Sequence, residues 1–151
     1  MLASPSQDDV RRFFCSVAAA RRNEGNGGAS RPLEAIEVLA AYWIDEHPEY
    51  QADLADVDAA LARVYDAADG RGNPFLHLSM HLSISEQCSI DQPRGIRQAV
   101  ELLAARCGSL HEAHHETMEC LGAMLWQSQR SGRAPDGAAY VECVQQRATR
   151  D

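Results

Sequence analysis

The stretch SLHEAHHETMECLGAMLWQSQR, residues 109–130, decides the fold class. Ser109 and Glu112 form a capping-box pattern, in which each side chain satisfies a backbone N–H group at the start of a helix. Gly132 follows the stretch, and glycine is the residue most often found just past the end of a helix. The pattern predicts one long helix between Ser109 and Gly132.

Helix signals of the same kind recur along the whole chain. Ser6 precedes two acidic residues that complement the dipole of a first helix, and Asn73 followed by Pro74 is a strong helix start. No segment alternates between apolar and polar residues as a half-buried strand does. The predicted helices cover residues 6–22, 30–48, 54–70, 73–89, 91–108, 109–132 and 135–148.

A chain of 151 residues is most simply one domain. We therefore predict an all-α fold, a single-domain bundle of six or seven helices over residues 1–151, with its main helical region at 73–148. Glycine and polar residues between positions 23 and 30 mark the N-terminal helix, residues 6–22, as the element expected to be mobile.

The composition narrows the classes of partner. The net charge is -8 and the fourteen basic residues, all arginine, are dispersed, whereas nucleic-acid binders gather basic residues on one face. No apolar run approaches the roughly 20 residues that span a bilayer, and the N-terminal residues lack a signal-peptide pattern. Five dispersed cysteines without a C-x-x-C motif predict free thiols. We expect a cytoplasmic protein that binds neither nucleic acid nor membranes.

Two pairs of histidines are the strongest candidates for chemistry. His77 and His81 lie in one predicted helix, and His111 and His115 lie in another. Residues four apart on a helix have Cβ atoms about 5–6 Å apart, so both imidazoles of a pair can converge on one ion. Two such helices can hold a divalent transition metal between them, and imidazole ligands suit zinc or iron. The prediction is a metal site with these four histidines as ligands.

Neighbouring polar residues have supporting or structural roles in this interpretation. Glu86 and Glu119 can orient a ring by accepting its second N–H group. Cys88 shares the stripe of the first pair and is a candidate soft ligand. His114 is assigned to packing, and His47, just before a proline, is assigned to the dipole at a helix end.

Other interpretations stay open. Histidines on a half-buried face commonly pack, and the protein is then a metal-free interaction module or a homodimer. An exposed apolar stripe around Met124, Leu125 and Trp126 would contact the protein partner. HEAHH, residues 111–115, also matches H-E-x-x-H, in which Glu112 activates a zinc-bound water, so a zinc hydrolase is a further possibility.

A set of longer motifs carries a resemblance to a known family. They are NPFLHLSMHLSISEQ (73–87), DQPRGIR (91–97), HEAHHETMECLGAMLW (111–126) and QRSGRAPDGAAY (129–140). Through them the chain resembles a small bacterial family of uncharacterised proteins, a domain of unknown function. In that family the second histidine motif reads H-E-A-E-H, which leaves His114 outside the site. Residues 51–72 follow the family less closely, so their helix boundaries are open. The resemblance supports the architecture and implies no activity.

Overall fold

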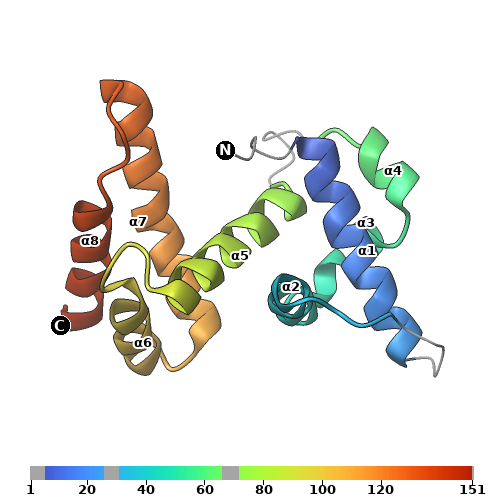
Figure 1. Cartoon of the computed structure of the whole chain (residues 1–151), viewed down its shortest axis with the longest axis horizontal. Coiled ribbons are helices and arrows are strands. Elements are labelled where there is room, and N and C mark those ends of the chain that lie inside the picture. Colours follow the sequence, from blue (N-terminus) through green and yellow to red (C-terminus); the bar gives the residue numbers. More distant parts are fainter. Residues whose placement is uncertain (1–5, 26–30, 66–71, 151) are drawn as a thin grey trace. The chain divides into compact units, whose positions relative to one another are not determined.

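Figure 1 shows the computed structural model of the chain, which describes residues 6–25, 31–65 and 72–150. These residues form eight α-helices and one 3-10 helix and contain no β-strand. The all-α prediction is therefore confirmed, with slightly more helices than the six or seven predicted. The chain divides into two compact units, residues 1–82 and 83–151, and the division falls within helix α5 (Pro74–Ile90). The single-domain organisation stays a prediction.

Helix caps fix where the elements of the N-terminal unit begin. Its elements are α1 (Gln7–Gly25), α2 (Ala35–Asp45), η1 (Pro48–Tyr50), α3 (Gln51–Leu54), α4 (Val57–Ala62) and the first part of α5. Before α1, the backbone N–H of Asp9 donates to Ser6 Oγ over 3.1 Å. Before α5, Asn73 Oδ1 accepts from the N–H of Phe75 over 2.9 Å. Both predicted caps, Ser6 and Asn73, are confirmed.

The core of this unit is built from apolar side chains at helical spacing. The helix α1 packs against α2, α3 and α4. The cluster of buried residues includes Phe14, Val17, Ala40, Trp43, Leu54, Phe75 and Leu78. Burial of each large apolar side chain contributes about 1.5–3 kcal/mol to folding. The cluster holds the end of α2 close to the first turns of α5, and this is the region of the candidate site.

The chain between residues 51 and 65 differs from the single helix predicted over 54–70. It forms α3 and α4, separated at Ala55 and Asp56. The reason is a new cap: Asp56 Oδ1 accepts from the backbone N–H of Asp58 over 3.0 Å and starts a second helix there. The end of the predicted helix, residues 66–70, lies outside the described residues. Ser30, the first residue of the helix predicted over 30–48, also lies outside the described residues. The helix α2 begins with a capping box of Glu34 and Glu37.

The C-terminal unit contains the rest of α5 together with α6 (Ile96–Cys107), α7 (Leu110–Ser131) and α8 (Gly137–Thr149), which pack against one another. Ser109 caps α7 by accepting from the N–H of Glu112 over 3.0 Å, as predicted, and Gly132 ends it in a left-handed conformation, φ +71°. At the turn before α6, Asp91 Oδ1 accepts from two backbone N–H groups, of Gly95 and Arg97.

A disulfide bond joins Cys120 of α7 to Cys143 of α8, with Cα atoms 5.9 Å apart. The prediction of five free thiols is therefore wrong for these two cysteines, while Cys15, Cys88 and Cys107 are free. The two partners are 23 residues apart on different helices. Their pairing depends on how α7 packs against α8, and no local spacing announces it.

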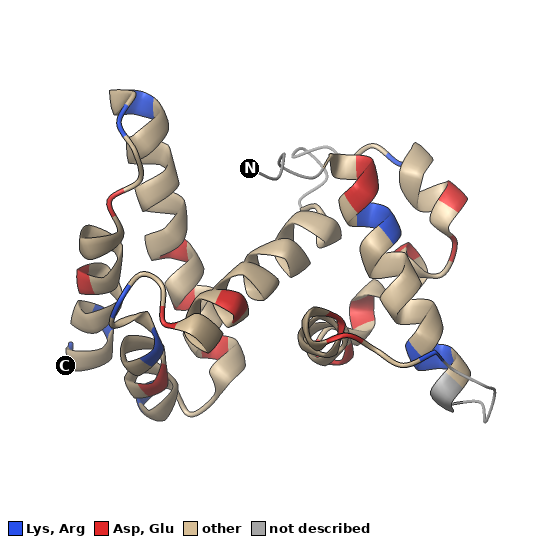
Figure 2. Ribbon diagram, viewed as in Figure 1, with Lys and Arg blue, Asp and Glu red and all other residues tan. Residues whose placement is uncertain are grey.

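Charged residues are distributed over the helices of both units, and Figure 2 shows basic and acidic segments interspersed within single helices. Among the described residues, no helix combines the length and the apolar character needed to cross a bilayer.

Candidate metal site

Three imidazole rings meet in the N-terminal unit. Along α5, the Nε2 atoms of His77 and His81 lie 3.1 Å apart, as their four-residue spacing predicts. His47, between α2 and η1, brings its own Nε2 to 3.1 Å from that of His81. His81 is fully buried, His47 is 4% exposed and His77 is half-buried. The three residues therefore form one cluster of ring nitrogens, which we call the His47–His77–His81 cluster.

The local sequence explains how His47 reaches this position. Pro48 follows it, and a residue before proline is disfavoured in the helical conformation. His47 has φ −127° and ψ 65°, so the chain leaves the helix at this point. The N–H of His47 donates to Ile44 O over 3.1 Å, and its carbonyl accepts from Tyr50 over 2.9 Å. These bonds hold the backbone of His47 between two helical segments and direct its ring towards α5.

A carboxylate orients the His47 ring. Glu49 Oε2 lies 2.8 Å from His47 Nδ1. A carboxylate accepts hydrogen bonds, so Nδ1 carries the hydrogen, and in the neutral ring Nε2 carries the lone pair. This Nε2 is the nitrogen that faces His81. A carboxylate behind a histidine is the usual arrangement for orienting a metal ligand.

Aromatic rings hold the histidines in place. Trp43, 1% exposed, stacks on His81 with centroids 3.9 Å apart and planes within 11°. Tyr50 stacks on His47 with centroids 4.8 Å apart and planes within 8°. Flat stacking leaves the ring nitrogens at the edges of the stack, where they face one another. The rings are therefore preorganised and need little side-chain ordering to bind a ligand.

The distances between these nitrogens suit a shared cation. His81 Nε2 faces the Nε2 atoms of His47 and His77, each at 3.1 Å. Ligand nitrogens about 2.0–2.1 Å from a tetrahedral zinc are about 3.3 Å apart, close to the observed separations. The arrangement can hold a divalent transition metal through three neutral imidazoles.

The second predicted pair lies in the C-terminal unit, in the first turns of α7. The rings of His111 and His115 have centroids 4.5 Å apart and planes at 74°. Each offers a ring nitrogen within 4.8 Å of the other's, and both residues are half-buried. The pair thus has the convergence that its spacing predicts.

The acidic residues that the sequence suggested as supporting or catalytic groups are exposed in the structure. Glu119 has a side chain 65% exposed and forms an ion pair with Arg147 of α8. Glu86 and Glu112 are exposed. The supporting roles of Glu86 and Glu119 stay predictions, whereas the carboxylate of Glu49 does contact a histidine ring.

Two further candidate residues, His114 and Cys88, have pKa values that burial shifts. His114 is 1% exposed, and desolvation lowers its pKa to about 3, so it is a neutral, packed residue as predicted. Burial raises the pKa of the Cys88 thiol to about 11. The role of Cys88 as a soft ligand stays a prediction.

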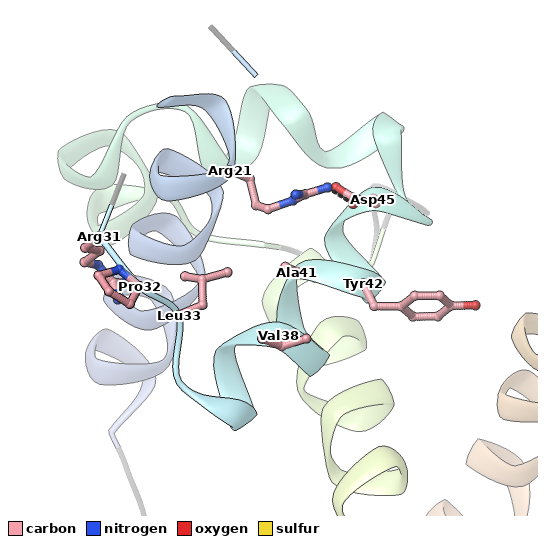
Figure 3. A pocket seen from close by; sticks show the side chains of 8 residues that line it. All are labelled: Arg21, Arg31, Pro32, Leu33, Val38, Ala41, Tyr42 and Asp45. Atoms are coloured by element: carbon pink, nitrogen blue, oxygen red, sulfur yellow. Dashed lines mark hydrogen bonds and ion pairs between the residues drawn. The ribbon is translucent and has the colours of Figure 1, made fainter. Parts of the chain in front are cut away.

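A surface pocket of about 560 Å³ lies between α1 and α2, and no histidine is among the residues that line it (Figure 3). Arg21 in its wall is paired with Asp45 at 2.5 Å, and Arg31 is paired with Glu37. The positive charges of the pocket are thereby balanced by carboxylates. The arrangement gives an anion no unbalanced positive charge to bind.

The principal residue that the sequence interpretation missed is His47. The sequence assigns it to a helix dipole because it lies just before Pro48 at a helix end, and it is 34 residues from His81 along the chain. A signal was nevertheless present in HPE, residues 47–49, where a proline forces the chain out of the helix and an acidic residue follows two positions after a histidine. That pattern places a carboxylate within reach of the ring, as the structure does.

Comparisons with known proteins supply a family and no activity. No curated protein and no solved structure matches this chain. Residues 6–146, nearly the whole sequence, match a family described as a domain of unknown function, DUF1841. The expected membership of a family described as a domain of unknown function is therefore confirmed. This chain belongs to the DUF1841 family.

Proposed function

We propose that this protein binds a divalent transition metal through the His47–His77–His81 cluster. The observation that supports the proposal is the convergence of three Nε2 atoms, two pairs of them at 3.1 Å, with Glu49 behind one ring. Neutral imidazoles bind zinc, iron, nickel and copper, and zinc or iron remains our choice. With three protein ligands a coordination position stays open to water or substrate, as in catalytic sites.

The histidines predicted from α7 enter the proposal as further ligands. His111 and His115 have the same spacing as the pair on α5, and their rings converge in the same way. A metal bound by both pairs would have four imidazole ligands, or five with His47. No coordination position would then stay open to water, which favours a structural role over a catalytic one. Variants of this pair therefore decide between an open and a closed site.

Metal content is the direct test. Untagged protein, purified without chelators or nickel resin, is expected to contain about one zinc or iron per chain by mass spectrometry. His77→Ala and His81→Ala should each abolish loading while the helical circular dichroism is retained. Full stoichiometry in both variants would overturn the proposal. His114→Asn is the matched control, since it removes a buried histidine that lies outside the cluster.

The same measurement on His111→Ala and His115→Ala addresses the C-terminal pair. Loss of metal in both variants supports the closed, larger ligand set. Normal loading assigns the metal to the three histidines of the N-terminal unit alone.

A metal-free interaction module is the second candidate, and one observation favours it. Trp126 and Leu125 of α7 are 57% and 44% exposed. Exposed large apolar residues side by side are common in protein interfaces. This candidate predicts association that depends on protein concentration and is unaffected by chelators. Sedimentation of wild type and Trp126→Ala distinguishes it from the metal proposal.

The zinc hydrolase interpretation has less support, because Glu112 is exposed in the first turn of α7. Its test is Glu112→Gln, which should keep zinc and abolish turnover if that mechanism holds.

A further inference from the structure

The disulfide of the C-terminal unit lies in the wall of a groove. A cavity of about 830 Å³ between α7 and α8 is lined by Cys120 and Cys143 together with Met124, Trp126 and Tyr140 among others. A volume of this size suits a small molecule. Cys143 is half-buried, whereas Cys120 is 2% exposed. Cys143 is therefore the more exposed residue of the pair.

The helix α8 is held in place by other contacts besides the disulfide. Tyr140 and Val144 are buried, at 1% and 0% exposure, and Tyr140 Oη donates to Gln87 Oε1 over 2.7 Å. Arg147 also forms an ion pair with Glu119 of α7. These contacts remain when the disulfide opens, so the unit can keep its fold in the dithiol form.

The free thiols of the chain are poorly suited to compete in this chemistry. Cys107 donates to Glu116 over 3.0 Å, and this hydrogen bond raises its pKa to about 11. Burial raises the pKa of Cys88 to about 11 and also raises that of Cys15. Thiol–disulfide exchange requires a thiolate, so a raised pKa disfavours these thiols as competitors of an external thiol at neutral pH.

We propose that Cys120–Cys143 is a redox-active pair that exchanges with small-molecule thiols entering the groove between α7 and α8. In the first step an external thiolate attacks Cys143 Sγ and forms a mixed disulfide, while the Cys120–Cys143 bond breaks and Cys120 leaves as a thiolate that takes up a proton. A second external thiolate attacks the sulfur of the bound small molecule. It releases Cys143, which also takes up a proton. Two external thiols are thereby oxidised to one disulfide, and the protein disulfide is reduced to two thiols.

The test uses the native full-length chain in a series of glutathione buffers with different ratios of thiol to disulfide. Samples are quenched with acid, alkylated and mapped by mass spectrometry. We expect the pair to move between disulfide and dithiol with the buffer ratio, while helical circular dichroism is unchanged. A pair that is reduced only after urea is added overturns the proposal and makes the disulfide a purely structural one.

Variants identify the attacked sulfur. Cys120→Ser should accumulate a mixed disulfide on Cys143 with glutathione disulfide, whereas Cys143→Ser should form at least tenfold less adduct on the buried Cys120. Cys107→Ser is the matched control and should exchange as the wild type does. If the variants fail to fold, the wild-type titration alone decides the question, because it requires no substitution.

Discussion

Glu49 Oε2 lies 2.8 Å from Nδ1 of His47, and Nε2 of the same ring lies 3.1 Å from Nε2 of His81. One imidazole thus connects an exposed carboxylate to the buried end of the cluster. The hydrogen bond from Nδ1 leaves the lone pair on the inner nitrogen, where a metal needs it. In the metal site that we propose, Glu49 would act through His47 as a positioning residue.

Glu49→Gln should weaken metal binding about 10–100-fold without unfolding the protein, which is the usual effect of losing a partner behind a metal-bound histidine. Isothermal titration with zinc measures the affinity. Glu46→Gln is the control, since it removes an equal charge at an exposed neighbouring position. The carboxylate of Glu46 accepts a hydrogen bond from Tyr42 and does not orient His47. Equal affinities in the two variants would show that Glu49 has no positioning role.

Trp43 should report metal binding directly, because its ring stacks on His81 at 3.9 Å. The chain has two tryptophans, so Trp126→Phe leaves Trp43 as the single emitter. In this variant, paramagnetic Ni²⁺ at stoichiometric concentration should quench the emission, and Zn²⁺ should compete and restore it. Adding His81→Ala should remove the quenching. Quenching that persists in that variant places the metal elsewhere.

Arg11 should be a strong stabilising residue of the N-terminal unit. It is 7% exposed, and its Nη1 donates to the carbonyls of Ala60 and Arg63 at 2.7 Å each. Arg11→Ala removes both charge-assisted bonds, so the free energy of unfolding should fall by about 2–4 kcal/mol in urea titrations. Arg12→Ala, at the exposed neighbouring position, should change it by about 0.5 kcal/mol or less. Similar losses in both variants would contradict this account.

Glu37 should make the stability depend on pH in the acid range. Hydrogen bonds from the Arg31 guanidinium and the backbone N–H of Glu34 lower its pKa to about 2. The folded state then binds this proton less readily than the unfolded chain does, so the stabilisation is complete above an ordinary glutamate pKa of about 4.3 and is lost as the pH falls towards 2.

Glu37→Gln removes this effect, and the difference in midpoint urea concentration between pH 7 and pH 3 should become smaller than in the wild type. Glu101→Gln, at an exposed position of α6, should behave as the wild type does. An unchanged difference in Glu37→Gln would mean that other groups cause the acid sensitivity.

Local signals in the sequence predict much of the fold. Ser6, Asn73 and Ser109 each cap the helix that they were expected to begin, because a capping side chain needs only the next three residues. The same locality explains why both histidine pairs converge, since the spacing of four is enough to make two rings neighbours on a helix.

Features that depend on tertiary packing were not predictable in the same way. His47 joins His81 from 34 residues away, and Cys120 joins Cys143 from 23. Each contact is created when one helical segment packs against another, and the periodicity of a single helix contains no information about it. The break between α3 and α4 lies between these two cases. The cap at Asp56 is a local signal, but the apolar pattern of the predicted helix continues through it and competes with the cap.

The two long-range links have different thermodynamic consequences. The disulfide closes a loop of 23 residues in the unfolded chain as well. The lower conformational entropy of that state raises its free energy by roughly 3–4 kcal/mol at 25 °C. A metal at the His47–His77–His81 cluster would bind only while residues 1–82 are folded. The free energy of unfolding of these residues would therefore rise with the free metal concentration. Reductants should therefore lower the stability of residues 83–151, and chelators should lower the stability of residues 1–82.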